Sequence, residues 1–145
     1  MHLTRSGSLI TASLLTLGIL SGCSSTGQEV RVALCQDMTA IALGRAPTWR
    51  GTDIQLQGYQ DAVILVRFAT DSGEGRGECH YPHLKGEDTA ITLATPIEAY
   101  STSPSRLVIN GRIFTGPDLA RVMEQALKKQ GREFIDRVKD SVRGQ

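Results

Sequence analysis

The sequence has almost no net charge and few aromatic side chains. Sixteen Lys and Arg residues stand against fifteen Asp and Glu residues, the formal net charge is +1 at pH 7, and aromatic residues make up 5% of the chain. Nucleic-acid-binding domains usually carry a strong excess of basic residues. A field that would attract nucleic acid or anionic lipid over the whole surface is therefore absent, and we expect no nucleic-acid partner.

Motifs that bind cofactors or carry out catalysis are also missing. No two cysteines are separated by two residues, which argues against thiol exchange chemistry, and no serine lies in the glycine-flanked elbow of a hydrolase. The glycine-rich segment 71–77 has the spacing of neither an EF-hand nor a phosphate-binding loop. We therefore expect a protein that is not an enzyme and that uses no cofactor.

The chain lacks an apolar run long enough for a permanent membrane span near its N-terminus. The run at 9–20 holds about 12 residues and is interrupted by polar ones, whereas a spanning helix needs about 20. It follows Arg5 and leads to the small residues Ser21 and Gly22, which is the plan of an export signal. We predict that residues 1–22 are a signal peptide that is removed.

The four residues around the predicted cleavage site are Leu20, Ser21, Gly22 and Cys23. They resemble the lipobox of bacterial lipoproteins, in which a branched apolar residue and two small residues precede the cysteine that becomes the new N-terminus. The resemblance covers the leader alone. It implies a diacylglycerol on the thiol of Cys23 and a fatty acid such as palmitate on its amine, and each buried CH₂ of these chains adds about 0.8 kcal/mol of membrane binding. An ordinary secretory leader followed by a chance cysteine is the alternative.

The residue after the cysteine bears on the location. In Gram-negative members of that class, a residue other than Asp at this position accompanies transfer to the outer membrane, so Ser24 implies an outer-membrane lipoprotein that faces the periplasm. Residues 23–29 would then be the lipidated cysteine and a short tether, because Ser, Thr and Gly leave the backbone free. Residues 30–145 have the size of a single domain.

Two cysteines remain after Cys23, and an exported chain reaches an oxidising compartment. We therefore expect a disulfide between Cys35 and Cys79. Two buried free thiols are one alternative. A metal site is another, because thiolates together with His80 and His83 are ligands that zinc and copper accept, although His80 and Cys79 would point to opposite faces of an extended strand. Without a ligand role, both histidines are expected in a wet turn at the strand end.

The pattern of apolar residues predicts an α+β domain. Apolar side chains recur every three or four positions over 30–43, which indicates a helix, and Gly44 supplies its stop. Antiparallel strands are expected from alternation and β-branched runs, and Asn110 with Gly111 fits a two-residue hairpin turn. The expected strands are 52–57, 62–70, 75–81, 106–109 and 112–114, while 84–105 is expected as a loop with at most one short strand at 90–94.

A second apolar stripe runs from Leu119 to Val142 and predicts a long C-terminal helix packed on the sheet, or two helices that meet at Gly131. One helix would reach about 39 Å, longer than a small sheet needs, so its far end would project. We expect Phe134, Ile135, Val138 and Val142 to bind an envelope protein, although covering the sheet is the plainer alternative. The sequence thus predicts a lipid-anchored envelope protein with a non-enzymatic protein-binding or structural role; the alternative is a periplasmic metal-binding protein that uses His80 and His83.

Overall fold

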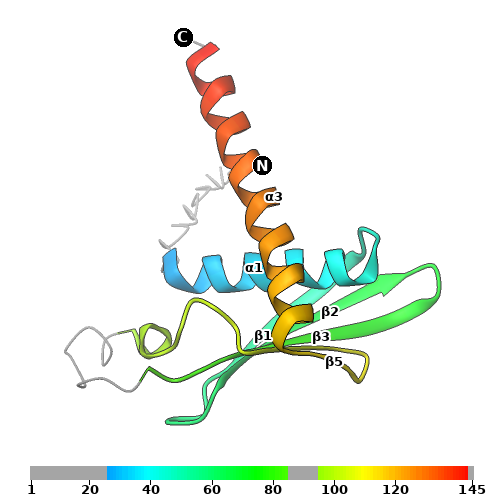
Figure 1. The fold of residues 1–145 in the computed structure, drawn as a ribbon, viewed down its shortest axis with the longest axis vertical. Helices are drawn as coiled ribbons and strands as arrows, with labels where there is room; N and C mark the ends of the chain where they lie inside the picture. Colours follow the sequence, from blue (N-terminus) through cyan, green and yellow to red (C-terminus); the bar gives the residue numbers. More distant parts are fainter. Residues whose placement is uncertain (1–25, 85–94, 144–145) are drawn as a thin grey trace, which may run out of the picture.

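The computed structural model of the chain describes residues 26–84 and 95–143. Figure 1 shows one helix, α1, lying across a face of the sheet and a second helix, α3, standing steeply on the first. The predicted α+β class, with an antiparallel sheet and two such helices, is confirmed. The elements in chain order are α1 (Thr26–Leu43), β1 (Thr48–Gln55), β2 (Ala62–Thr70), β3 (Gly73–Tyr81), the 3-10 helix η1 (Pro96–Ala99), β4 (Arg106–Ile109), β5 (Arg112–Phe114) and α3 (Gly116–Arg143).

The five strands form one sheet in chain order, and every neighbouring pair is antiparallel. Strand β2 has the predicted bounds, and alternate residues of its apolar run are buried beneath α1. The hairpin of β4 and β5 also has the predicted bounds. Asn110 and Gly111 have φ angles of 49° and 86°, the left-handed conformations that its two-residue turn requires.

Four boundaries differ from the predicted ones. Helix α1 begins at Thr26 rather than at residue 30, and β3 begins at Gly73, where it pairs with Thr70 across a shorter turn. Strand β1 begins at Thr48 rather than at residue 52 and ends at Gln55 rather than at residue 57. Its register shifts between Trp49 and Gly51, and such a bulge breaks the alternation by which a strand is recognised in sequence. The short strand expected at 90–94 lies outside the described residues.

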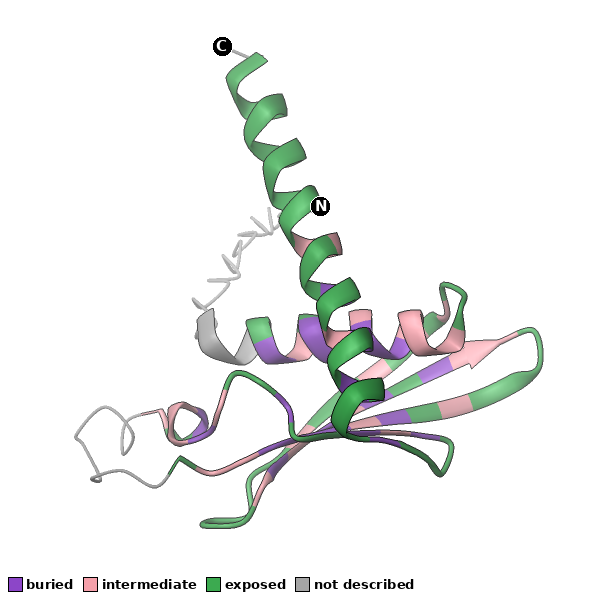
Figure 2. Cartoon of the chain, viewed as in Figure 1, coloured by how far each residue is buried: buried purple, intermediate pink, exposed green. Residues whose placement is uncertain are grey.

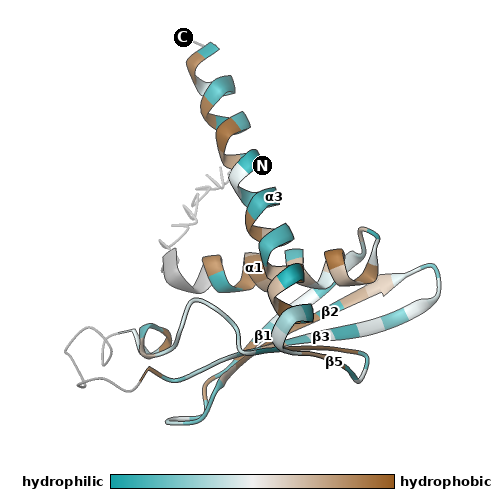
Figure 3. Cartoon of the chain, viewed as in Figure 1, coloured by the Kyte–Doolittle hydropathy of each residue, from teal (hydrophilic) through white to brown (hydrophobic). Residues whose placement is uncertain are grey.

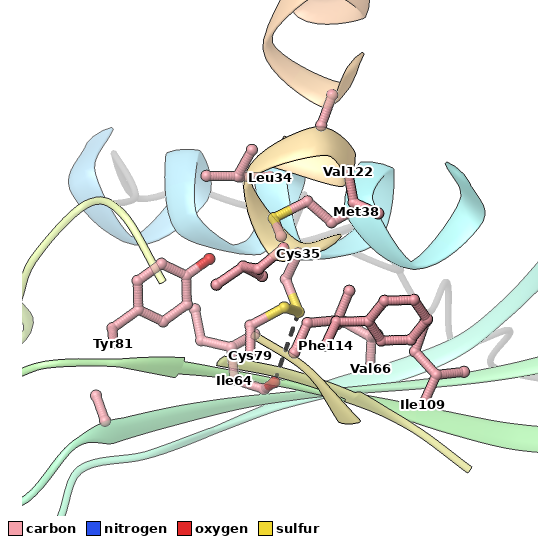
Figure 4. Packing of buried hydrophobic residues seen from close by; sticks show 14 of the residues in the cluster. Leu34, Cys35, Met38, Ile64, Val66, Cys79, Tyr81, Ile109, Phe114 and Val122 are labelled. Atoms are coloured by element: carbon pink, nitrogen blue, oxygen red, sulfur yellow. Dashed lines mark hydrogen bonds between the residues drawn. A yellow bond between two sulfur atoms is a disulfide. The ribbon is translucent and has the colours of Figure 1, made fainter. Parts of the chain in front are cut away.

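The disulfide between Cys35 and Cys79 is present, as predicted, and joins the middle of α1 to β3. Both cysteines are fully buried, and Figure 4 shows them among the apolar side chains that α1 and the sheet bring together. Gly77, also on β3, allows the close approach of the helix: a β-carbon there would lie 2.5 Å from the Thr39 Oγ1. The disulfide and the glycine thus fix α1 on the sheet.

Helix α3 is one continuous helix that runs through Gly131. Its principal neighbour is α1, not the sheet as predicted. Helix α1 already occupies that face of the sheet, so α3 adds Leu119, Val122 and Ala126 to the core from its first three turns. Figure 4 shows Val122 among the side chains of this cluster. The consequence is that α3 leaves the domain at a steep angle.

Candidate functional site

The last part of α3 carries an apolar stripe that no described residue covers. Every residue from 131 to 143 is exposed (Figure 2). We call Phe134, Ile135, Val138 and Val142 the distal stripe; they are 60%, 52%, 45% and 70% exposed. At 100° per residue, these four side chains fall within an arc of about 100°, and Figure 3 shows hydrophobic residues recurring along this part of the helix. The four residues predicted to bind a partner therefore share one free face.

The distal stripe projects from a fixed base. Lys129 forms an ion pair with Asp37 of α1, and the Gln130 Nε2 donates a hydrogen bond of 2.8 Å to the Asp37 Oδ2. The hydrogen bond to Asp37 raises the pKa of Lys129. These contacts join α3 to α1 just before the exposed segment, so the direction of the stripe is set by the domain.

A shallow hollow of about 320 Å³ lies beside the start of the stripe, between α1 and α3. Val30 of α1 and Phe134 of α3 supply its apolar walls and are 52% and 60% exposed. The stripe therefore continues onto α1 as a concave apolar surface of the kind that accepts side chains of a partner helix. The lining consists of Val30, Ala33, Asp37, Gln130, Glu133, Phe134 and Arg137.

The polar face of the same segment explains how the helix persists without packing. Glu133 lies 3.4 Å from Lys129, and Asp136 lies 3.8 Å from Lys139. Pairs spaced three or four residues apart stabilise an exposed helix by a few tenths of a kcal/mol each. Charges of both signs lie outside the stripe, so its apolar face rather than a charge excess is what this segment offers to a partner.

His80 does not lie in a solvent-exposed turn, as was predicted for it without a ligand role. It is 9% exposed, and the Arg106 guanidinium donates to its Nδ1 at 3.0 Å. The same Arg106 Nη2 lies 3.4 Å from the His80 Nε2, and a Glu78 carboxylate oxygen lies 3.9 Å from that nitrogen. Burial and then the charge of Arg106 lower the pKa of His80, while Glu78 acts in the opposite direction. His80 therefore belongs to a polar network on the sheet in which the neutral form of its ring is favoured.

His83 lies in a separate aromatic group. Its ring contacts Tyr59 and Tyr100 edge-on, with centroids 5.2 Å away in each case, and Cys79 is committed to the disulfide. In the parts of the chain that the structure describes, no three His, Cys, Asp or Glu side chains are placed to hold a metal ion. The metal-site alternative with His80 and His83 therefore gains no support from this geometry.

Cys23, the predicted lipid-attachment residue, and residues 1–22, the predicted signal peptide, lie outside the described residues. Of the described helices, none combines the length and apolar character needed to cross a membrane. No protein-family model, curated protein or solved structure matches the chain. What the protein does must therefore be inferred from its own residues and their arrangement.

Proposed function

We propose that this protein is a lipoprotein of the bacterial outer membrane that binds another envelope protein through the distal stripe and carries out no catalysis. In this proposal residues 1–22 are removed and acyl chains on Cys23 hold the domain at the membrane, facing the periplasm. The lipobox-like residues 20–23 support the anchor. The exposed apolar stripe on a helix with a fixed base supports the binding role.

The observation that carries the binding role is that α3 continues for 13 residues, 131–143, without one buried side chain. Covering the core requires the helix only as far as Ala126, its last buried residue. Isolated helices of this length are marginal in water, yet the segment keeps four large apolar side chains on one face. A partner that covers these side chains accounts for their position and their number.

The binding role is tested by a crosslinking pull-down from native envelopes, with wild type compared to a chain truncated after Gln130. We expect the truncated chain to lose a partner that the wild type retains, while its free energy of unfolding changes by no more than about 0.5 kcal/mol, as for surface changes. A Phe134→Asp, Val138→Asp variant should behave in the same way. Asp136→Asn changes the opposite face and is the matched control. An unchanged set of partners in both altered chains contradicts the proposal.

The anchor is tested separately by the intact mass of protein extracted from membranes. We expect the mass of a chain that begins at Cys23 and carries two or three acyl chains. A Cys23→Ser variant should lack these acyl chains and leave the membrane fraction. Functional material that still carries Met1 and no lipid would refute the anchor and, with it, the envelope location.

A further inference from the structure

Three arginines gather on the sheet, away from the distal stripe. Arg50, Arg67 and Arg76 line one hollow of about 760 Å³ near the β2–β3 hairpin, within the size range of small-ligand sites. Arg67 lies directly opposite Arg76 in the register of β2 and β3. Residues of β2 that alternate with the buried ones point away from α1, and Figure 1 shows both helices on the other face of the sheet. The hollow is therefore open to solvent.

Two local features of β1 position the side chains of Arg50 and Arg67 in the hollow. Arg50 is the extra residue of the bulge between Trp49 and Gly51, and a bulge redirects a side chain out of the regular alternation. At Gly51, a β-carbon would lie 3.0 Å from the Arg67 Nη2. The glycine thus leaves the space in which the Arg67 guanidinium lies.

Arg76 is held from the other side by the turn of the β4–β5 hairpin. Its backbone N–H donates to the Asn110 Oδ1 at 2.9 Å, and the Asn110 N–H donates back to the Arg76 carbonyl at 3.1 Å. Asn110 thus fixes the backbone of Arg76 at the edge of the hollow, whose lining it shares. Both groups are positioned before any ligand arrives.

The charges in the hollow are not balanced within the described protein. Arg76 pairs with Glu78 at 3.1 Å, but Arg50 and Arg67 form no ion pair with any described residue. The lining contains one acid, Glu74, against three arginines. Like charges directly opposite one another destabilise a sheet by a few tenths of a kcal/mol or more, and a sequence that departs from such a rule often does so at a functional site.

We infer that this hollow binds an organic oxyanion, a ligand that carries phosphate or carboxylate groups beside an apolar portion. Guanidinium groups match the oxygen pairs of both anions with two parallel hydrogen bonds. Leu65, which points to the same face as Arg67, supplies the apolar part of the lining. The site is separate from the distal stripe, so it does not depend on the binding role proposed for α3.

The inference is tested by NMR titration of the purified full chain at constant ionic strength, which keeps general screening of charge the same in every sample. The probes are pyrophosphate, citrate and dihexanoyl-phosphatidylglycerol. We expect saturable shifts of backbone amides around the β2–β3 hairpin. Saturation by pyrophosphate or citrate identifies a free oxyanion as sufficient, and saturation by the lipid alone identifies a headgroup with its acyl chains.

Arg67→Gln and Arg50→Gln should each weaken binding about tenfold, the effect of losing one charge-assisted contact of about 1.4 kcal/mol. Arg132→Gln removes the same charge from α3 and should leave the affinity unchanged. The saturating probe should raise the melting temperature of the wild type more than that of Arg67→Gln. Absence of saturable binding for all three probes overturns the inference, as does equal weakening by Arg67→Gln and Arg132→Gln.

Discussion

Breaking the bond between Cys35 and Cys79 should be the most damaging single covalent change to this domain. The disulfide spans 44 residues of chain, and the loss of loop-closure entropy for that length corresponds to about 4 kcal/mol. A domain of this size has a total stability of about 5–15 kcal/mol. We therefore expect reduction to leave a folded but marginal protein whose melting temperature is lower by about 15 °C.

The measurement is urea unfolding of the wild type with and without a reducing agent, beside a Cys35→Ala, Cys79→Ala variant. Reduction removes the crosslink and keeps the sulfur atoms, whereas the variant also removes atoms from two fully buried positions. The variant should therefore lose somewhat more than the reduced wild type, because unfilled volume in a core is destabilising. A loss below about 1 kcal/mol on reduction would refute the loop-closure argument.

Three further changes test the packing and the polar contacts. Gly77→Ala should destabilise the protein by about 1–3 kcal/mol, since its β-carbon would lie 2.5 Å from the Thr39 Oγ1. Adding Thr39→Ala removes this oxygen and should restore much of the lost stability, as measured by denaturant unfolding of the single and double variants. Because the pKa of His80 is lowered in the folded state, the unfolded chain takes up the proton at a higher pH, and the free energy of unfolding should fall as the pH drops below about 6.5, by at most about 1.4 kcal/mol per pH unit. In melting curves recorded over this pH range, His80→Gln should reduce the dependence of stability on pH. An unchanged dependence in this variant counts against His80 as the group responsible. Asp37→Ala removes the partner of Lys129 and should lower the free energy of unfolding by about 1–2 kcal/mol. Backbone amides at the start of the exposed segment should then exchange with solvent faster than in the wild type. Unchanged exchange rates would contradict the role of Asp37 in fixing α3 to α1.

Several elements could be predicted from sequence because their causes are local. A continuous apolar, β-branched run produced β2, and the Asn110–Gly111 pair produced the hairpin with both left-handed conformations. Gly44, with a φ of 68°, ends α1 where predicted. The partner of Cys35 was also predictable, because one other cysteine remained once Cys23 was assigned to the lipid.

Features with distant causes were not predictable in this way. The bulge at Arg50 concealed the start of β1, and the salt bridge between Asp37 and Lys129 joins residues 92 positions apart. His80 was expected in water because it was assigned to a turn at the end of its strand. In the structure Arg106, 26 residues away, covers it.

The sequence by itself determined the kinds of element, most of their bounds, the disulfide partners and the apolar stripe at the end of the chain, because periodicity, turn residues and cysteine number act within short segments. Only the tertiary structure decided that α3 packs on α1, that the distal stripe stays exposed, and that Arg50, Arg67 and Arg76 share one hollow. The order of the layers depends on which apolar faces pack against one another, because α1 and α3 cannot both cover the same face of the sheet. This choice depends on the whole chain and cannot be read from any single segment.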